Sequence, residues 1–254
     1  CGFGGYKESG FGREGGSEGI RAYTQNILPK KNYKKKNITK INISLPNIDR
    51  TPKLYIGGKQ KRPDGGYSFG LNSIDGSFIC DIASANRKDV RDCVETASKS
   101  LSKQPNNFNR SQILYYLAEN LQLRKKTFID LLISLTGISK IEAIKEFDYS
   151  CERLFFYASK ADKFEGSIHN PPIRGLTLAI KEPFGIIASI LNDDSPLLSL
   201  ITILGSVFAT GSANIIVPSQ KTSLIATELY QVLDTSDVPS GYINILTAKE
   251  NELN

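Results

Sequence analysis

The chain has 254 residues, of which 40% are hydrophobic and 23% charged, with a net charge of +6. This composition is typical of a globular protein with one large domain or two small ones. The longest apolar run, residues 196–210, is too short to cross a bilayer, and four scattered cysteines argue against a disulfide framework. With one histidine and no CxxC spacing, no metal site is expected.

The chain opens with a glycine-rich stretch. Residues 10–15 read GFGREG, which fits the GxGxxG pattern of dinucleotide-binding proteins. That pattern holds phosphate only between a buried strand and a helix, and residues 1–9 contain three glycines and no run of Val, Ile or Leu. A flexible loop is therefore favoured over a phosphate cradle.

A lysine-rich segment follows. Six lysines and no acidic residue lie between residues 30 and 40. The charge of this segment, +6, equals the net charge of the whole chain. A solvated linker is the simplest interpretation, and we expect residues 30–50 to be mobile. Binding to a nucleic acid or another polyanion through these lysines is the alternative, which salt-dependent binding to an oligonucleotide would support.

The middle of the chain predicts short strands and then helices. Residues 54–56, followed by paired glycines, indicate a hairpin. Helical periodicity begins at Ala85, and a capping box over 139–142 opens a long helix toward Ala161. Residues expected to line the inner faces of the first two helices are Val90, Val94, Ala97 and Leu101, and then Ile113, Leu117 and Leu121.

The last third alternates between strands and helices. Residues 185–191 form a continuous apolar run, as expected of a strand buried on both faces. Ser195 is expected to cap a helix that begins at Pro196. Two further strands are predicted at 213–217 and 242–246, separated by a helix. This β-α-β-α-β order predicts a parallel sheet, and ligands bind such sheets at the carboxyl ends of the strands.

Three segments of this region carry a resemblance to the aldehyde dehydrogenase superfamily. They match the family patterns EPxGVxxxIxPWNxPL, ATGNTVVVKPSE and LPPGVVNVVTG in order and spacing. In this chain the matching segments are EPFGIIASI at 182–190 with PLL at 196–198, ATGS at 209–212 with IIVPS at 215–219, and VPSGYINILT at 238–247.

The resemblance extends from about residue 53 to 248, because YIGGK at 55–59 is similar to the family's opening hairpin. It implies an α/β fold with a doubly wound parallel sheet, the Rossmann-like amino-terminal domain of the family in incomplete form. The hairpin near 53–70 and a strand at 176–182 would then lie outside the main sheet, in a small β oligomerisation element.

The opening glycines also resemble this family. FGGYKESGFGRE at 3–14 is similar to PFGGYKxSGxGRE, which lies near the carboxyl end of an aldehyde dehydrogenase. The resemblance implies the junction of a tandem protein: residues 1–28 as the tail of a first unit, 29–52 as a linker and 53–254 as the start of a second unit. The chain is thus expected to be a fragment of a longer protein.

The family oxidises aldehydes to carboxylic acids with NAD or NADP, using a cysteine nucleophile, an oxyanion-binding asparagine and a glutamate base. No GQxC motif occurs in this chain, so no catalytic residue is assigned. The resemblance implies cofactor contacts from two strand ends, at Ile190, Leu191, Pro218, Ser219 and Gln220.

Three positions depart from the family pattern. Asp194 replaces the oxyanion asparagine, Val217 replaces the lysine that reaches the adenosine ribose, and Gln220 replaces a glutamate. An ionised carboxylate repels a developing oxyanion, and losing one such donor costs on the order of 10²–10³ in rate. Asp193 and Asp194 also add negative charge beside the expected pyrophosphate. We expect weak or absent NAD binding by this chain.

Two functions follow from the resemblance. The chain is either part of an active aldehyde dehydrogenase, itself non-catalytic, or a structural or oligomerising module that kept the fold and lost the chemistry. A cysteine after Gly-Gln in the upstream unit would support the first alternative. We expect a cytoplasmic homo-oligomer whose parent protein acts on an aldehyde, with no nucleic-acid or membrane partner.

Overall fold

The structure is a computed structural model that describes residues 51–163, 166–169, 172 and 174–249. The chain divides into two compact units, of which one contains residues 166–180 and the other contains the remaining described residues. The linker and the glycine-rich opening predicted for residues 1–50 lie outside the described residues.

The first unit contains a β-hairpin. Strands β5 (Ser167–His169) and β6 (Thr177–Ala179) pair antiparallel, with Ile168 opposite Leu178. Both of these side chains are exposed. The expectation that residues 176–182 lie outside the main sheet is confirmed, because β6 pairs with β5 alone. Its assignment to an oligomerisation element stays a prediction.

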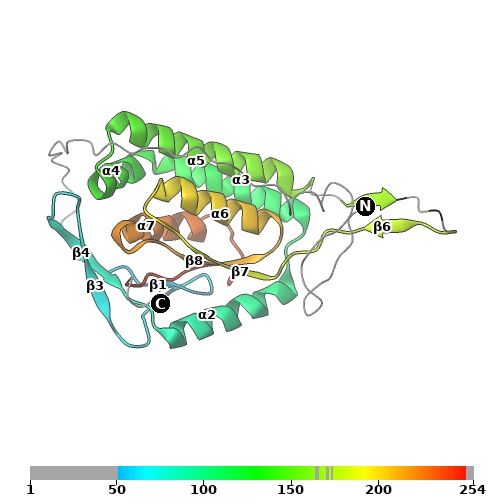
Figure 1. Cartoon of the computed structure of the whole chain (residues 1–254), viewed down its shortest axis with the longest axis horizontal. Coiled ribbons are helices and arrows are strands. Elements are labelled where there is room, and N and C mark those ends of the chain that lie inside the picture. The colour runs from blue at the N-terminus through cyan, green and yellow to red at the C-terminus, as the bar shows by residue number, and fades with distance from the viewer. Residues whose placement is uncertain (1–50, 164–165, 170–171, 173, 250–254) are drawn as a thin grey trace. The chain divides into compact units, whose positions relative to one another are not determined.

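The second unit is built on a five-stranded mixed sheet (Figure 1). Strands β7 (Ile186–Ile190), β8 (Ala213–Val217) and β9 (Ile243–Ile245) are parallel neighbours, as the sequence predicted. Every residue of β8 except Val217 is buried, which suits its β-branched, apolar composition. The predicted α/β fold with an incomplete sheet is confirmed.

Strands β1 (Leu54–Tyr55) and β2 (Gln60–Lys61) correct one expectation. They lie in the main sheet, where β1 pairs antiparallel with β9 through Tyr55 and Ile245. The reason is burial: Leu54 and Tyr55 are at most 2% exposed. The Tyr55 ring stacks on Tyr230 at 4.9 Å. Pairing with β9 brings these side chains under α7, which carries Tyr230 and packs on β1.

A separate two-stranded sheet follows, formed by β3 (Ser68–Asn72) and β4 (Phe78–Ala83). Only residues 68–70 of the expected hairpin at 53–70 belong to this sheet, and the expectation placed no second hairpin at 68–83.

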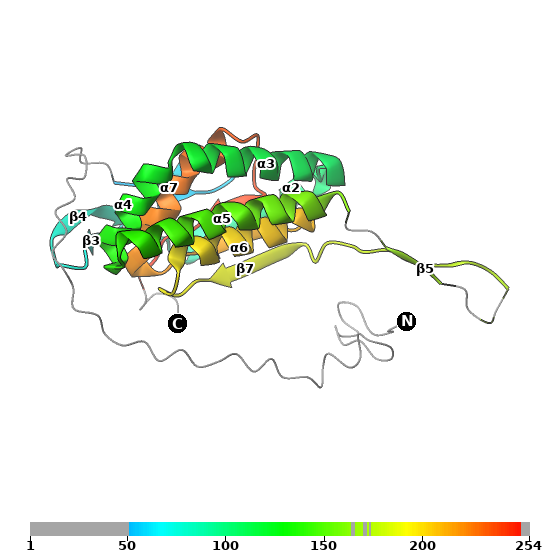
Figure 2. The same ribbon diagram turned by 90° about the horizontal axis from the view of Figure 1, so that it is seen from above.

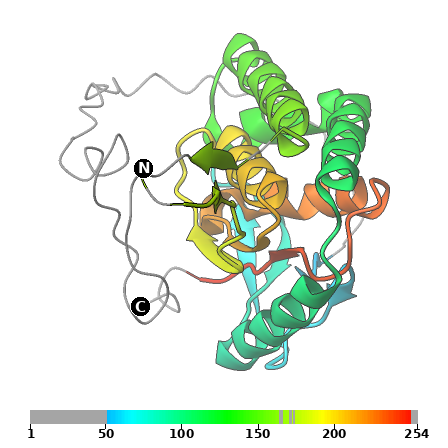
Figure 3. The ribbon, with the colours of Figure 1, turned by 90° about the vertical axis from the view of Figure 1, so that its right-hand side faces the viewer.

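Helices cover both faces of the main sheet. Helix α2 (Arg87–Ser100) packs on one face, and α6 (Pro196–Ala209) and α7 (Ser223–Asp234) lie on the other, as Figures 1 and 3 show. The crossovers β7-α6-β8 and β8-α7-β9 produce the parallel pairing. Short 3₁₀ turns, η2 (Leu101–Lys103) and η3 (Gln220–Thr222), follow α2 and precede α7.

An outer helical layer packs against α6 and α7. It consists of α3 (Asn107–Leu123), α4 (Lys125–Thr136) and α5 (Lys140–Ala161). Figure 2 shows α5 lying between α3 and α6. The predicted inner face of α3 is confirmed, with Ile113, Leu117 and Leu121 buried, and so is the capping box of Ser139 with Glu142.

The expected inner face of α2 is partly wrong. Ala97 is completely buried, as predicted, and Leu101 packs partly buried against the core. Val90 and Val94 are instead 45% and 41% exposed, and Asp89 and Cys93 are completely buried. Asp89 determines this rotation of the helix. Its carboxylate accepts the backbone N–H groups of Asp64 and Asn86, and this ties the turn before β3 to the start of α2.

Strand β7 is less buried than its apolar sequence predicted. Ala188 and Ile190 are exposed, because β7 is an edge strand of the described sheet. Among the described residues, no helix is both long and apolar enough to cross a membrane.

Candidate cofactor site

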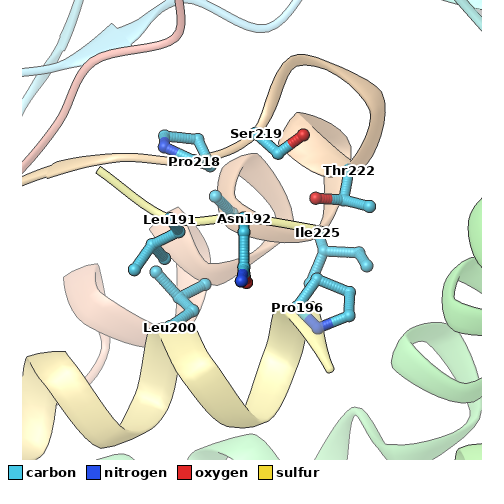
Figure 4. A pocket seen from close by; sticks show the side chains of 9 residues that line it. Leu191, Asn192, Pro196, Leu200, Pro218, Ser219, Thr222 and Ile225 are labelled. Carbon is cyan, nitrogen blue, oxygen red and sulfur yellow. The ribbon is translucent and has the colours of Figure 1, made fainter. Parts of the chain in front are cut away.

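A small hollow lies at the carboxyl ends of β7 and β8, where ligands of parallel α/β sheets bind. In Figure 4, side chains that follow β7 face side chains that follow β8 across it. The space that the centre of a water-sized sphere can reach there is about 10 Å³, enough for one water molecule. Its lining residues are Leu191, Asn192, Pro196, Leu200, Pro218, Ser219, Thr222, Ile225 and Ala226.

The structure brings three of the five predicted cofactor residues together in this hollow, namely Leu191, Pro218 and Ser219. Ile190 ends β7 beside it, with its side chain 67% exposed. Gln220 begins η3, and its backbone carbonyl accepts the Ser223 hydroxyl at 2.9 Å. The backbone N–H of Leu191 donates to the Val217 carbonyl at 2.9 Å, which extends the strand pairing to the edge of the hollow.

Asp193 connects the two sides of the site. It lies in the β7–α6 loop, and its Oδ1 accepts a hydrogen bond from the Ser219 hydroxyl. Its Oδ2 accepts from the Lys221 ammonium at 3.3 Å. Both carboxylate oxygens are thus used to join the loop after β7 to the segment after β8. The sequence suggested negative charge here, but it gave no indication of this connection.

The N-terminus of α6 is capped by a residue that the sequence did not indicate. Ser195 has φ 45° and makes no side-chain capping hydrogen bond, which corrects its expected role. Instead, Glu146 Oε1 on α5 accepts the backbone N–H groups of Leu197 at 2.9 Å and Leu198 at 3.3 Å. Burial raises the pKa of Glu146, and these two hydrogen bonds offset part of that effect.

Asp194, at the position of the family's asparagine, is exposed on the loop before α6. Its backbone N–H donates to the Asn192 side-chain oxygen at 3.3 Å, and its backbone carbonyl accepts the Ser199 hydroxyl at 3.0 Å. These contacts hold the loop in a tight turn.

Two cysteines of the described region are poor nucleophiles. Cys93 and Cys151 are buried, and burial raises the pKa of each thiol to about 12. A thiol with such a pKa stays protonated near neutral pH. Within the described ranges, no group of three or more His, Cys, Asp or Glu side chains is arranged to hold a metal ion.

This hollow by itself is too small for NAD or NADP, since its volume suits a single water molecule. A second, more open hollow of about 480 Å³ adjoins it at the end of β7, where Ile190, Leu191 and Asn192 line it together with residues of α6. The donors that would face a phosphate already have carboxylate partners: Ser219 and Lys221 donate to Asp193, and the first amides of α6 donate to Glu146. A phosphate group that bound here would compete with these carboxylates for the same donors.

The chain was compared with curated proteins. It is 27% identical over 225 residues to cytosolic 10-formyltetrahydrofolate dehydrogenase of Mus musculus, covering 85% of this chain and 24% of that protein. It is 27% identical over 205 residues to D-glyceraldehyde dehydrogenase (NADP(+)) of Picrophilus torridus, covering 79% of this chain and 42% of that protein. The chain thus spans less than half of the length of these relatives.

Solved structures share the fold. An aldehyde dehydrogenase from Bacillus cereus superposes with a TM-score of 0.78 at 20% identity, covering 80% of this chain and 43% of that chain. Betaine aldehyde dehydrogenase from Staphylococcus aureus, in a complex with NAD+, gives a TM-score of 0.77 at 20% identity, with coverage of 80% and 42%.

A family model provides the assignment. The model of the aldehyde dehydrogenase family matches residues 70–254, which is most of the chain. This match agrees with the three motifs at the strand ends and with the parallel order of β7, β8 and β9. The chain belongs to the aldehyde dehydrogenase family.

Proposed function

We propose that residues 53–254 are the cofactor-binding-type part of an aldehyde dehydrogenase unit, and that its parent protein oxidises aldehydes to carboxylic acids with NAD or NADP. The observation that carries this proposal is the meeting of Leu191, Pro218 and Ser219 at the carboxyl ends of two parallel strands. This is the edge at which an α/β sheet of this kind receives a nucleotide.

The proposed role of this chain within the parent is non-catalytic. The reaction requires a thiolate that is accessible and ionised. Cys93 and Cys151 are neither, and Asp194 stands where an oxyanion donor would be needed. Cys80 is half-buried but does not stand in the GQxC motif of the family's nucleophile. We therefore infer that the chemical step belongs to residues of the parent other than those described.

The names of two relatives support the cofactor class and the compartment. One is a D-glyceraldehyde dehydrogenase (NADP(+)), and another is a cytosolic dehydrogenase. We extend these properties to the parent as NAD or NADP use and a cytoplasmic location. We also propose a homo-oligomer, with the hairpin of β5 and β6 as part of its oligomerisation element, since exposed apolar residues such as Ile168 and Leu178 favour a covering partner.

We further propose the tandem arrangement, with residues 1–28 as the tail of a preceding aldehyde dehydrogenase unit and residues 29–52 as a linker. Its support is the FGGYKESGFGRE motif at 3–14, which belongs near the carboxyl end of such a unit. Sequencing the coding DNA upstream tests it. The proposal requires an in-frame unit that contains a cysteine after Gly-Gln.

A structural or oligomerising pseudo-enzyme is the second candidate. Asp194 and Val217 favour it, because each replaces a polar ligand of the family's reaction. An activity assay separates the two candidates. The parent protein is expressed and mixed with a panel of aldehydes and either cofactor, and reduced cofactor is measured. Activity that depends on the upstream cysteine supports the first candidate, and none from an intact, folded parent supports the second.

A further inference from the structure

We propose that Asp193, Ser219 and Lys221 form a latch that holds the cofactor crevice closed, so that a nucleotide phosphate must displace the Asp193 carboxylate in order to bind. This inference rests on the proposed function, since it concerns the same crevice. It assigns to Asp193 a gating role, in addition to its contribution to the local negative charge.

The latch joins segments that a ligand would have to separate. Asp193 is 26 residues from Ser219 and 28 residues from Lys221. The aspartate follows β7 and its two partners follow β8, so one carboxylate fixes the spacing between two strand ends. Of the three latch residues, Ser219 lines the hollow of about 10 Å³, which is far smaller than a nucleotide requires. The β7 end also borders the open hollow of about 480 Å³ lined by Ile190, Leu191 and Asn192.

The two donors differ in how easily they can be released. Ser219 is 8% exposed, and its single hydroxyl hydrogen is used by Asp193. Lys221 is on the surface, with 72% of its side chain exposed and three donor hydrogens. The lysine can therefore contact an incoming phosphate at once, but Ser219 can do so only after its bond to Asp193 has broken.

The chemistry of the latch resembles that of a bound phosphate. A hydroxyl and an ammonium group are the donors that a phosphate oxygen accepts from, and a carboxylate presents a similar pair of anionic oxygens. Asp193 therefore occupies the positions of such an anion and repels a second one. Glu146 does the same at the amides of Leu197 and Leu198, independently of Asp193.

Asp194 provides a matched control. It carries the same charge as Asp193 and is adjacent to it, yet its hydrogen bonds go to Asn192 in the same loop and to Ser199 in the first turn of α6, and none of them reaches Ser219 or Lys221. Replacing either aspartate with alanine removes one negative charge from the same loop. Only the Asp193 change opens the latch.

The first measurement concerns the latch without any ligand. Melting temperatures are compared for the full chain, Asp193→Ala, Ser219→Ala and the double variant. The stability effects of mutations at two contacting residues are not additive. We therefore expect the double variant to melt about 2 °C higher than it would if the two single decreases in melting temperature simply added. Additive effects would overturn the latch.

The second measurement titrates NADP, and in parallel NAD, into the full chain and into Asp193→Ala and Asp194→Ala, with circular dichroism to check folding. We expect Asp193→Ala to bind about tenfold more tightly, the effect of one charge-assisted hydrogen bond. Asp194→Ala removes the same nearby negative charge but leaves the latch intact, so it should tighten binding by no more than about threefold. Equal gains from both variants would mean general charge repulsion and overturn the gate.

The two proposals fail in different ways. In one outcome the melting effects of the two variants are non-additive, and Asp193→Ala binds NADP or NAD measurably but no more tightly than the unmodified chain. This outcome overturns the gate and leaves the proposed function intact. In the other outcome the melting effects are non-additive, but no folded variant binds NADP or NAD. This outcome contradicts the proposed cofactor site, and with it the gate.

Discussion

The carboxylate of Glu146 on α5 accepts the backbone N–H of Leu197, 51 residues further along the chain, at 2.9 Å and so caps the start of α6. A carboxylate at this end of a helix satisfies amides that have no partner within the helix. Since α6 forms the crossover between β7 and β8, Glu146 also fixes the helix that borders the candidate cofactor site.

Replacing this cap tests its contribution to stability. Glu146→Ala leaves the amides of Leu197 and Leu198 without their partner, and we expect the free energy of unfolding to fall by about 1–2 kcal/mol. Urea unfolding at neutral pH measures it. Glu152→Ala, on the same helix but exposed, is the control and should change stability by less than about 0.5 kcal/mol. Equal effects of the two changes would contradict the capping role.

Glu146 should also give stability a specific pH dependence. Burial raises its pKa in the folded state above the ordinary value of 4.5. A raised carboxyl pKa contributes stability that is complete below the unfolded-state pKa and is lost as the pH rises through the folded-state pKa. Glu146→Gln keeps an oxygen acceptor and does not titrate. The stability of Glu146→Gln relative to the unmodified chain should therefore increase as the pH rises from the unfolded-state pKa of Glu146 through its folded-state pKa. A stability difference that is the same below and above these two pKa values would contradict a raised pKa at Glu146.

Arg110 is expected to be essential for the stability of the fold. It is 5% exposed, and its guanidinium donates to the carbonyls of Ala209 and Pro105 and to the Asn107 side chain. Arg110→Ala should lower the free energy of unfolding by about 2–4 kcal/mol, because buried acceptors lose charged donors. Arg91→Ala, at an exposed ion pair, is the control and should cost less than about 1 kcal/mol. Chemical denaturation of both variants makes the comparison.

At Gly211 a substitution would meet both backbone strain and a steric clash, and comparison with a second glycine separates the two. Its φ is +82°, and an added Cβ would lie 2.1 Å from Gln104 Nε2 and 3.1 Å from Arg110 Nη1. Gly76 has φ +86° and open space around it. Alanine at either position costs about 1–2 kcal/mol for the backbone alone. Gly211→Ala should exceed Gly76→Ala by about 1 kcal/mol or more in denaturant unfolding, and equal costs would show that Gln104 moves aside freely.

The thiols should differ in reactivity. Burial and a pKa raised to about 12 protect Cys93 and Cys151, whereas Cys80 is half-buried on β4. Under native conditions, iodoacetamide should modify Cys80 well before Cys93 and Cys151, as followed by peptide mass spectrometry. Fast modification of Cys93 or Cys151 in the folded chain would contradict the assignment of both as inert core residues.

Local sequence signals predicted the parallel sheet well. The alternation of apolar runs and helices gave β7, β8 and β9 in the correct order, and the Ser139 capping box gave the start of α5. Each of these signals depends on residues close together in the sequence, where periodicity and capping act.

Contacts between residues far apart in the chain could not be predicted from the sequence. The rotation of α2 depends on Asp89 reaching the turn at Asp64, and apolar periodicity alone favoured Val90 and Val94 instead. The Glu146 cap and the Asp193 latch join residues that tertiary folding brings together. Neither pairing leaves a pattern in the chain that could have revealed it.

The most direct test of the account is a calorimetric titration of the folded 254-residue chain with NAD. The small hollow, the occupied donors at Ser219 and Leu197, and Val217 at the family's lysine position all predict weak binding. We expect a dissociation constant in the millimolar range. A micromolar dissociation constant would contradict the account of a closed cofactor site.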